Sequence, residues 1–372
     1  MTTLNTLQPS QNLDSNLKSK QNKLPLIQVF RGIAALLVVA YHLTIRSAEL
    51  AQQNLLFGFF KFGYAGVDFF FVLSGFIIYY VHKQDIGKPR KFKEFISKRM
   101  VRIYPIYLLI TLLILPVYLV GYGDEYKTDI GVIVKSLLLL PQNEGVYPVL
   151  NVGWTLSFEA LFYVMFGAAI LLKPKLTIII FGAWILTVSG MFVSELQGLD
   201  LTNDTLINFV FNSHNLEFML GCLAAYLVTA KNINYGKYLM LVGGAWMIVS
   251  SVNNYIYGEF YVHPVIAYGI PSTLIVIGAA AYDRIKPANP PEFLMYLGDA
   301  SYSIYLTHFV IITAMLIGFL KLGILDFIGY QVAMAVIVLV TIALGCLVYT
   351  YIEKPMLNYC RRKFVFKARA TT

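Results

Sequence analysis

The sequence predicts an all-α fold, a polytopic membrane helix bundle of about ten transmembrane helices with both termini in the cytoplasm. Of the 372 residues, 58% are hydrophobic and 13% are charged, whereas an ordinary soluble domain carries about 25% charged residues. Apolar segments of about 18 residues or more recur along the chain, which is the length that a transmembrane helix requires. These segments are continuous rather than alternating, so a transmembrane β-barrel is disfavoured.

Ten segments are expected to span the membrane. They cover residues 26–45, 64–82, 103–121, 151–172, 176–194, 206–229, 238–256, 262–281, 300–320 and 328–350. The first 23 residues are polar and rich in Asn, Gln and Ser, so we expect a disordered cytoplasmic tail there rather than a signal peptide. The three cysteines form no CxxC motif and no disulfide framework.

The distribution of positive charge predicts the orientation of the helices. With a cytoplasmic N-terminus, the predicted inside segments hold 23 of the 29 Lys and Arg residues, and the predicted outside loops hold five. An excess of Lys and Arg in cytoplasmic loops is typical of multi-spanning membrane proteins. The net charge of +9 therefore indicates membrane topology, and no nucleic-acid partner is expected.

Arg31 and His42 lie eleven residues apart on the first predicted span. A helix turns about 100° and rises about 1.5 Å per residue, so the two side chains share one face and differ by about 16 Å in depth. Ionisable residues inside a transmembrane helix are costly and indicate function by default. On the predicted topology, Arg31 lies near the cytoplasmic surface and His42 lies in the outer half of the membrane.

Asp68 and Glu159, on the second and fourth predicted spans, are expected at a depth similar to that of His42. A neutral imidazole accepts a proton from a hydroxyl, and a nearby carboxylate orients the ring and stabilises the imidazolium. The three groups therefore predict an acid–base site. The alternative is that these polar side chains only hold helices together by hydrogen bonds.

Two further segments carry polar patterns with two interpretations each. In LGDASYSIYLTH, the helical spacing of Ser301, Tyr305 and His308 predicts a stripe lining a cavity; the alternative is an interfacial aromatic belt. In SKRMVRIYPIY, Arg99 and Arg102 share a helix face that would bind phosphates; the alternative is an ordinary topology signal. There is no HExxH motif and the five histidines are scattered, so no metal site is expected.

Six motifs occur along nearly the whole chain. They are FRGIAALLVVAYHL, YAGVDFFFVLSGF, SKRMVRIYPIYLL, VGWTLSFEALFYV, LEFMLGCLAAYL and LGDASYSIYLTH. On these motifs the chain resembles the acyltransferase-3 family of integral membrane acyltransferases, which includes bacterial exopolysaccharide and O-antigen O-acetyltransferases. The GWTLSFEALFY form is most similar to the exopolysaccharide-modifying branch. Larger relatives add a C-terminal soluble hydrolase-like domain, and this chain departs from them by ending soon after Lys354.

The resemblance implies a membrane acyltransferase domain over residues 24–356, between the tail 1–23 and a basic cytoplasmic tail 357–372. It implies transfer of an acyl group, usually acetyl, from cytoplasmic acyl-CoA to a hydroxyl of a cell-envelope or extracellular polysaccharide or its lipid-linked precursor. The expected location is the bacterial inner membrane, with lipids as further partners. Acyl-CoA would be a co-substrate, and no bound cofactor is expected.

We expect three groups of site residues. They are the catalytic His42, Asp68 and Glu159, the donor-binding Arg31, Arg99, Arg102 and Tyr107, and the acceptor-binding Trp154, Tyr302, Tyr305 and His308. In the hypothesis that joins them, CoA phosphates bind the cytoplasmic arginines and the thioester reaches His42 through the bundle. His42 then acts as general base on a sugar hydroxyl from outside, with Asp68 or Glu159 orienting its ring.

Three alternatives remain at this point. A transporter or flippase of a glycan intermediate would use His42 and Glu159 as a proton relay. A membrane assembly partner would use its polar groups only to hold helices together. An enzyme with a different acyl group or acceptor would share every feature above.

Overall fold

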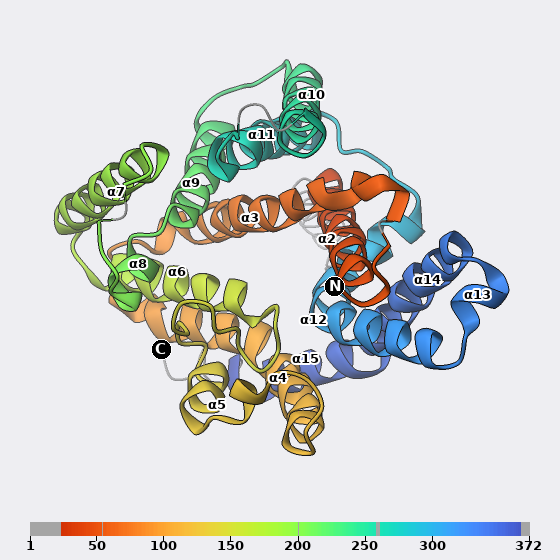
Figure 1. The fold of residues 1–372 in the computed structure, drawn as a ribbon. Helices are drawn as coiled ribbons and strands as arrows, with labels where there is room; N and C mark the ends of the chain where they lie inside the picture. Colours follow the sequence, from red (N-terminus) through yellow and green to blue (C-terminus); the bar gives the residue numbers. More distant parts are fainter. Residues whose placement is uncertain (1–23, 54, 200, 258–260, 366–372) are drawn as a thin grey trace, which may run out of the picture.

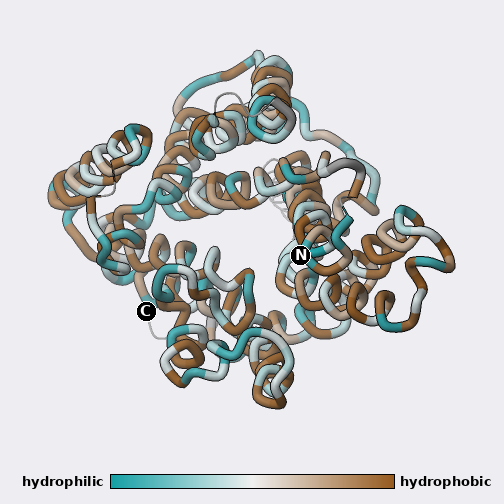
Figure 2. Tube along the Cα trace, in the orientation of Figure 1, coloured by the Kyte–Doolittle hydropathy of each residue, from teal (hydrophilic) through white to brown (hydrophobic). Residues whose placement is uncertain are grey.

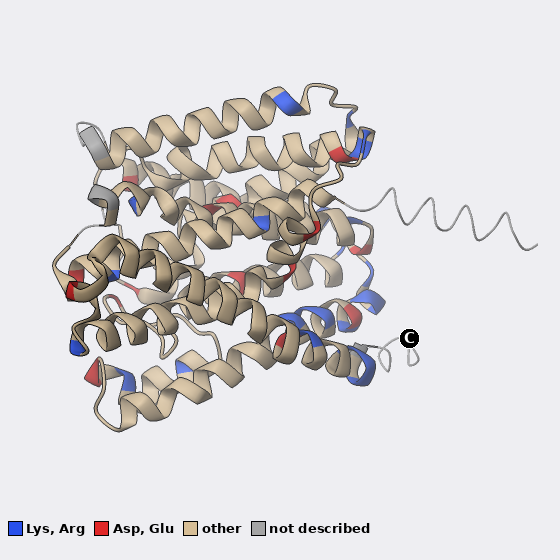
Figure 3. Cartoon of the chain, turned by 90° about the vertical axis from the view of Figure 1, so that its right-hand side faces the viewer, with Lys and Arg blue, Asp and Glu red and all other residues tan. Residues whose placement is uncertain are grey.

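The computed structural model describes residues 24–53, 55–199, 201–257 and 261–365. In this part the chain is helical and contains no strand. The long helices run roughly parallel and form one bundle, seen along the helices in Figure 1 and from the side in Figure 3. The predicted all-α membrane bundle is confirmed, whereas the predicted tail 1–23 lies outside the described residues.

Ten long helices form the bundle within the described residues. They are α2 (Pro25–Ala51), α3 (Ala65–His82), α4 (Phe92–Leu119), α6 (Gly153–Leu171), α7 (Pro174–Leu196), α9 (His214–Ala230), α10 (Gly236–Val252), α11 (Ile270–Ile285), α12 (Glu292–Lys321) and α14 (Tyr330–Val348). The short helices are α5 (Ile130–Leu137), α8 (Thr205–Val210), α13 (Ile324–Ile328) and α15 (Lys354–Cys360).

Eight helical segments of the described part are long and apolar enough to cross a membrane, compared with the ten that the sequence predicts. The other two predicted spans, 206–229 and 238–256, correspond to α8 with α9 and to α10. The helices α9 and α10 have 17 residues each, which is about 26 Å of helix. That length is at the lower limit for a transmembrane helix.

Some helix boundaries differ from the hydropathy prediction because helices continue into polar sequence. The helices α4 and α12 begin at Phe92 and Glu292, rather than at residues 103 and 300. The segment 357–372, expected as a tail, is helical as far as it is described, through α15 and the π-helical stretch Arg361–Val365. Hydropathy cannot detect a helix that extends beyond the apolar layer.

The helices gather in three groups around a central pair. In Figure 1, α2 and α3 lie near the centre, α9–α11 lie beyond α3, α12–α14 lie beside α2, and α4–α6 with α15 close the third side. Buried apolar side chains form a separate large cluster in each group. The polar residues described below occupy the places where these groups meet.

Glycines allow two helix pairs to approach closely. A Cβ atom on Gly75 of α3 would lie 2.0 Å from the Phe218 carbonyl oxygen, and one on Gly221 of α9 would lie 1.9 Å from that of Val72. The same holds where α12 crosses α2, at Gly298. Small residues at such contacts are typical of packed membrane helices.

Charge distinguishes the two ends of the bundle. Figure 3 shows Lys and Arg concentrated at one end of the helices; this end, called the basic end below, carries segments 83–102 and 354–363. Figure 2 shows hydrophobic residues along the helices and hydrophilic residues in the connecting segments. Helix α2 starts at the basic end, where the Leu26 amide donates to the Asp283 carboxylate at 2.8 Å.

Candidate active site

Two histidines from distant parts of the chain meet between α2 and α12. Nδ1 of His42 lies 3.0 Å from Nε2 of His308, and the two ring centroids are 4.8 Å apart. His308 is fully buried, whereas His42 is partly exposed. The buried His308 ring therefore contacts one side of the His42 ring, and the other side of the His42 ring can be reached by a substrate.

Backbone carbonyls assign the tautomers of the two neutral rings. Nδ1 of His308 lies 2.6 Å from the Tyr305 carbonyl oxygen; because a carbonyl oxygen only accepts, this Nδ1 carries the proton and Nε2 of His308 accepts. Nδ1 of His42 lies 3.1 Å from the Val38 carbonyl oxygen and carries a proton for the same reason. The lone pair of His42 is therefore on Nε2, which makes no hydrogen bond within the described residues.

Glu159 does not contact His42, so it does not orient that ring as expected. One of its carboxylate oxygens accepts from the Ser74 hydroxyl at 3.1 Å and from the Tyr163 hydroxyl at 2.5 Å. Glu159 lies on the wall of a cavity at the basic end. Equal depth on two helices does not imply contact, because each helix also has to turn the residue towards the other.

Asp68 is likewise directed elsewhere. Its carboxylate is fully buried. One of its oxygens, a ring nitrogen of His214 and a carboxylate oxygen of Glu217 all lie within 4.8 Å of one another. The partner of the His42 ring is thus His308, which the sequence predicts as an acceptor-binding residue, and neither of the two acids.

A cavity of about 540 Å³ extends into the bundle from the basic end; we call it the basic-end cavity. Its basic lining residues are Arg31, Arg99, Arg102, Lys354 and Arg361. Apolar residues of α3 line its inner part, which reaches Thr155 and Tyr305. The Tyr305 ring centroid lies 5.7 Å from that of His308. The cavity therefore runs from a cationic entrance to Tyr305, one ring away from the histidine pair, and neither histidine is among its lining residues.

A buried carboxylate holds Arg102 in this wall. Arg102 Nη1 pairs with Oε1 of Glu353 at 2.7 Å, and the Ser303 hydroxyl donates to the other oxygen at 2.6 Å. Glu353 is fully buried, and the Arg102 guanidinium lies 5.0 Å from the Tyr302 ring centroid. Both oxygens of the carboxylate are satisfied, which is the condition for a stable buried ion pair.

Two further arginines of the cavity, Arg31 and Arg99, have neutral partners. Nη2 of Arg99 lies 3.0 Å from Nε2 of His82, and Nη1 of Arg31 donates to the Gln28 side chain at 3.1 Å. A guanidinium has five N–H donors in a planar fork. Their positive charge is therefore not neutralised by a direct carboxylate contact, and they are suited to bind an anion in the cavity.

A second cavity, of about 650 Å³, lies at the other end of the bundle; we call it the opposite-end cavity. It is lined by the loop 140–148, by Trp154 and Phe158 of α6, and by side chains between residues 195 and 213. Aromatic rings, amides and carboxylates make up much of the lining. That mixture differs from the cationic wall of the basic-end cavity.

Helix α6 separates the two cavities. Trp154, Ser157 and Phe158 face the opposite-end cavity, whereas Thr155, Leu156 and Glu159 face the basic-end cavity. Residues three and four apart share a helix face, so this alternation is what a one-helix wall produces. The Thr155 hydroxyl lies 2.7 Å from the Tyr305 hydroxyl, and this contact closes the inner end of the basic-end cavity.

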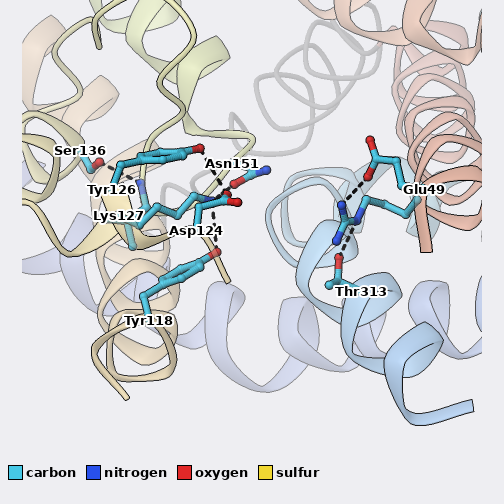
Figure 4. Close-up of polar contacts among 10 residues, drawn as sticks. Glu49, Tyr118, Asp124, Tyr126, Lys127, Ser136, Asn151 and Thr313 are labelled. Carbon is cyan, nitrogen blue, oxygen red and sulfur yellow. Dashed lines mark hydrogen bonds and ion pairs between the residues drawn. The ribbon is translucent and has the colours of Figure 1, made fainter. Parts of the chain in front are cut away.

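Lys127 holds the connection between α4 and α5 at the opposite end. Its side chain is buried, and Nζ donates to the Tyr118 hydroxyl at 3.2 Å and to the Asn151 side-chain oxygen. Asp124 lies 3.6 Å away, and Figure 4 shows the four side chains together. Burial lowers the pKa of Lys127 to about 8.

Arg46 lies one turn beyond His42 on α2. Its Nε donates to the Thr313 hydroxyl at 3.3 Å and its Nη1 pairs with Glu49. Figure 4 shows Glu49 and Thr313 across from the Lys127 network, and the charge of Arg46 contributes, after burial, to the lowered pKa of Lys127. Two cations therefore lie at this end of the molecule, on the side of His42 away from the basic end.

The predicted donor and acceptor residues are only partly brought together. Arg31, Arg99 and Arg102 line the basic-end cavity, together with Tyr302 and Tyr305. Trp154 lines the opposite-end cavity. Tyr107, predicted to bind the donor, is instead fully buried and donates its hydroxyl to the Ser136 carbonyl at 2.7 Å, because it faces α5 rather than the cavity.

Sequence reasoning missed Glu353, His214 and Glu217. Glu353 lies in a Glu-Lys-Pro segment just after the last predicted span, 328–350. Its acidic character beside an apolar span was the available signal. Glu217 and His214 carried the same signal at the start of α9, and the i, i+3 spacing places both on one face.

The helical bundle, with apolar helices and polar cavities entering from both ends, defines a multi-pass membrane protein. The family model for the acyltransferase domain matches residues 25–350, which is most of the chain. The chain therefore belongs to the acyltransferase-3 family, and the predicted membership is confirmed. This supports a membrane O-acyltransferase.

Two curated relatives match over most of this chain. The exopolysaccharide production protein ExoZ of Rhizobium meliloti is 28% identical over 318 residues, covering 82% of this chain and 93% of that protein. The peptidoglycan O-acetyltransferase OatA of Listeria monocytogenes is 24% identical over 326 residues, covering 78% of this chain and 49% of that protein. This chain thus spans about half the length of OatA. No solved structure matches the chain.

Proposed function

We propose that the protein transfers an acyl group, with acetyl as the expected group, from cytoplasmic acyl-CoA to a carbohydrate hydroxyl on the other side of the bacterial inner membrane. The observation that carries this proposal is the basic-end cavity, which leads from a cluster of arginines to the neighbourhood of His42 and His308. The relatives' names, which refer to exopolysaccharide and peptidoglycan, support a polysaccharide or its lipid-linked precursor as acceptor.

The donor would enter at the basic end. Lys and Arg accumulate on the cytoplasmic side of membrane proteins, which is also the side where acyl-CoA is available. Arginine binds phosphate through two parallel hydrogen bonds, so Arg31, Arg99 and the exposed Arg361 suit the CoA phosphates. The apolar side chains of α3 would line the path of the pantetheine arm towards Tyr305.

The acceptor would enter through the opposite-end cavity. Trp154 and Tyr147 offer aromatic faces, and Asn203, Asn208 and Asn212 offer donors and acceptors for sugar hydroxyls. Binding sites typically combine an apolar wall with a few placed polar groups. The cavity is separated from the donor side by the first turns of α6, so the two substrates would meet beyond the contact between Thr155 and Tyr305.

His42 would act as the general base. Nε2 of His42 accepts the proton of the sugar hydroxyl while the hydroxyl oxygen forms a bond to the thioester carbonyl carbon. The C–S bond then breaks, and the departing thiolate takes the proton from His42. His308 is a positioning residue in this scheme, because its Nε2 accepts from Nδ1 of His42 and keeps the lone pair on Nε2 of His42.

The test is O-acetylation of surface polysaccharide in a deletion strain, measured by proton NMR. Wild type should restore the acetyl signal and His42→Ala should not, at equal amounts of membrane-inserted protein. Gly182→Ala is the control, because it lies on α7 outside the proposed machinery and nothing lies within 4 Å of its Cβ position, and it should restore the signal. A full signal from His42→Ala would reject the base, and no signal from any strain would reject acetyl transfer to this acceptor.

Donor binding needs its own measurement. In membrane vesicles supplied with labelled acetyl-CoA, Arg361→Gln should raise the KM for acetyl-CoA and leave the KM for the acceptor unchanged. A change in the acceptor KM alone would place the donor elsewhere.

A further inference from the structure

Three side chains with metal-binding atoms meet outside the proposed active site, at the first turns of α3 and α9. They are Asp68, His214 and Glu217, and one ligand atom from each lies within 4.8 Å of the others. Asp68 and Glu217 are fully buried, and the side chain of His214 is 16% exposed. The group therefore lies inside the protein rather than on an acidic surface.

The polar atoms of this cluster lack hydrogen-bond partners. Within the described part of the chain, both carboxylate oxygens of Asp68, both of Glu217 and Nδ1 of His214 have none. No Lys or Arg of the described residues forms an ion pair with either acid; the nearest charged contact is His214 Nδ1 to Glu217 Oε2 at 3.5 Å. Buried carboxylates without a partner are strongly unfavourable. Either a proton shared between Asp68 and Glu217 or a cation bound between them would satisfy these oxygens.

We propose that Asp68, His214 and Glu217 bind a divalent transition-metal cation such as Zn²⁺. A neutral imidazole and two carboxylates are ligands that Zn²⁺ accepts, and the charge of the cation balances the two acids. Two atoms bound tetrahedrally to one Zn²⁺ lie about 3.4 Å apart, close to the 3.5 Å between His214 Nδ1 and Glu217 Oε2. Asp68 would supply the third ligand, from within 4.8 Å of the other two.

Aromatic rings and a glycine surround the cluster. The rings of Phe71, Trp154 and Phe158 lie 5.3, 5.8 and 5.7 Å from that of His214 by centroid. A Cβ atom at Gly269 would lie 3.1 Å from Oε1 of Glu217, so the glycine keeps the space beside that carboxylate open. Three protein ligands leave a fourth position for water or another donor.

The metal would join the first turns of α3 and α9, at the end of the bundle opposite the basic end. The two helices already approach closely deeper in the bundle, at the glycine contact described above. A cation at the first turns would fix the other end of the same helix pair, next to Trp154 of the opposite-end cavity. This role is structural, so it does not depend on the proposed acyl transfer.

The primary test uses wild-type protein, purified in detergent through a tag without histidine and without chelators. Inductively coupled plasma mass spectrometry should find about one Zn²⁺ per chain. After removal of the metal, Co²⁺ should produce the visible absorption bands of a four-coordinate site, and Zn²⁺ should abolish them. Absence of both the bound metal and the Co²⁺ bands would overturn the proposal.

Variants locate the site. Glu217→Gln and Asp68→Asn should each reduce bound metal at least tenfold and abolish the rise in thermal midpoint that added Zn²⁺ gives the wild type. The matched control is His263→Gln. His263 pairs with Glu195 at 3.1 Å, so this substitution removes an equivalent His–Glu contact outside the cluster. It should keep the metal. Unchanged metal content in both variants would contradict this site, and a wild type without bound metal would instead indicate two acids that share a proton.

Discussion

His42 and His308 are 266 residues apart in the chain, yet their ring nitrogens lie 3.0 Å from each other. The pair exists because α2 and α12 cross closely, and because the Tyr305 carbonyl fixes the proton of His308 on Nδ1. Without its partner, His308 would be an ordinary buried histidine and His42 a partly exposed one. Together they leave one free lone pair, on Nε2 of His42.

Removing His308 should slow transfer without preventing donor binding. His42→Ala removes the base, and we expect a loss of about 10²–10⁴-fold in kcat. His308→Ala should lower kcat by less, because the base remains and the Val38 carbonyl still accepts from its Nδ1, while the second acceptor that holds the ring is lost; the KM for acetyl-CoA should stay unchanged. His308→Gln should recover part of the rate, since its amide oxygen can accept from Nδ1 of His42. Initial rates in membrane vesicles measure this, and an equal loss for both His308 variants would contradict a positioning role.

Replacing Glu353 should destabilise the protein through Arg102. Glu353→Gln leaves the Arg102 guanidinium without its carboxylate in a buried site, and breaking such pairs costs about 3–5 kcal/mol. The thermal midpoint in detergent should fall by several degrees. The double variant Arg102→Gln with Glu353→Gln should lose less than the sum of the single losses, because contacting residues couple. Additive losses would show that the ion pair contributes little.

A methyl group at Gly221 should disturb the packing of α3 on α9. Gly221→Ala places a carbon 1.9 Å from the Val72 carbonyl oxygen, and such overpacking costs about 1–3 kcal/mol. Gly182→Ala on α7 is the control, because nothing lies within 4 Å of its Cβ position. Fluorescence-detected size-exclusion chromatography after heating should show loss of folded protein only for Gly221→Ala. Equal profiles for the two variants would contradict the close contact.

Lys127 should make stability depend on alkaline pH. Its pKa in the folded protein is about 8, below that of an unfolded lysine, about 10.4. Between these values the unfolded chain binds more protons, so stability should rise with pH there by about 1.4 kcal/mol per unit. Below pH 8 the full cost of burying the charge is present. The thermal midpoint from pH 8 to pH 9.5 should therefore rise more steeply for wild type than for Lys127→Met, and parallel curves would contradict the shift.

The sequence predicts the bundle well because hydropathy and charge report directly on the membrane. Arg31, Arg99 and Arg102 were predicted to share a binding site, and charge asymmetry was enough to place them at one end. The grouping of His42 with Asp68 and Glu159 rested on their similar depth alone, and the structure places neither acid beside His42. Depth follows from the position of a residue along a span, whereas contact depends on how each helix is rotated and which helices are neighbours.

The residues that the sequence left without a role are held by long-range packing. Glu353 meets Arg102 across 251 residues, and Asp68 meets Glu217 through the α3–α9 crossing. No local sequence pattern predicts contacts between residues so far apart in the chain. A buried acid next to a span was the only signal, and it does not name a partner.

The wall made by α6 has a consequence for the electrical insulation of the membrane. Polar cavities enter from both ends of the bundle, so the layer that stops ions is much thinner here than the lipid bilayer. It consists of the first turns of α6 and the contact of Thr155 with Tyr305. Any opening that lets the two cavities join would also let protons and small ions pass down their electrochemical gradient. A variant with a smaller residue at this contact is therefore expected to leak charge across the membrane.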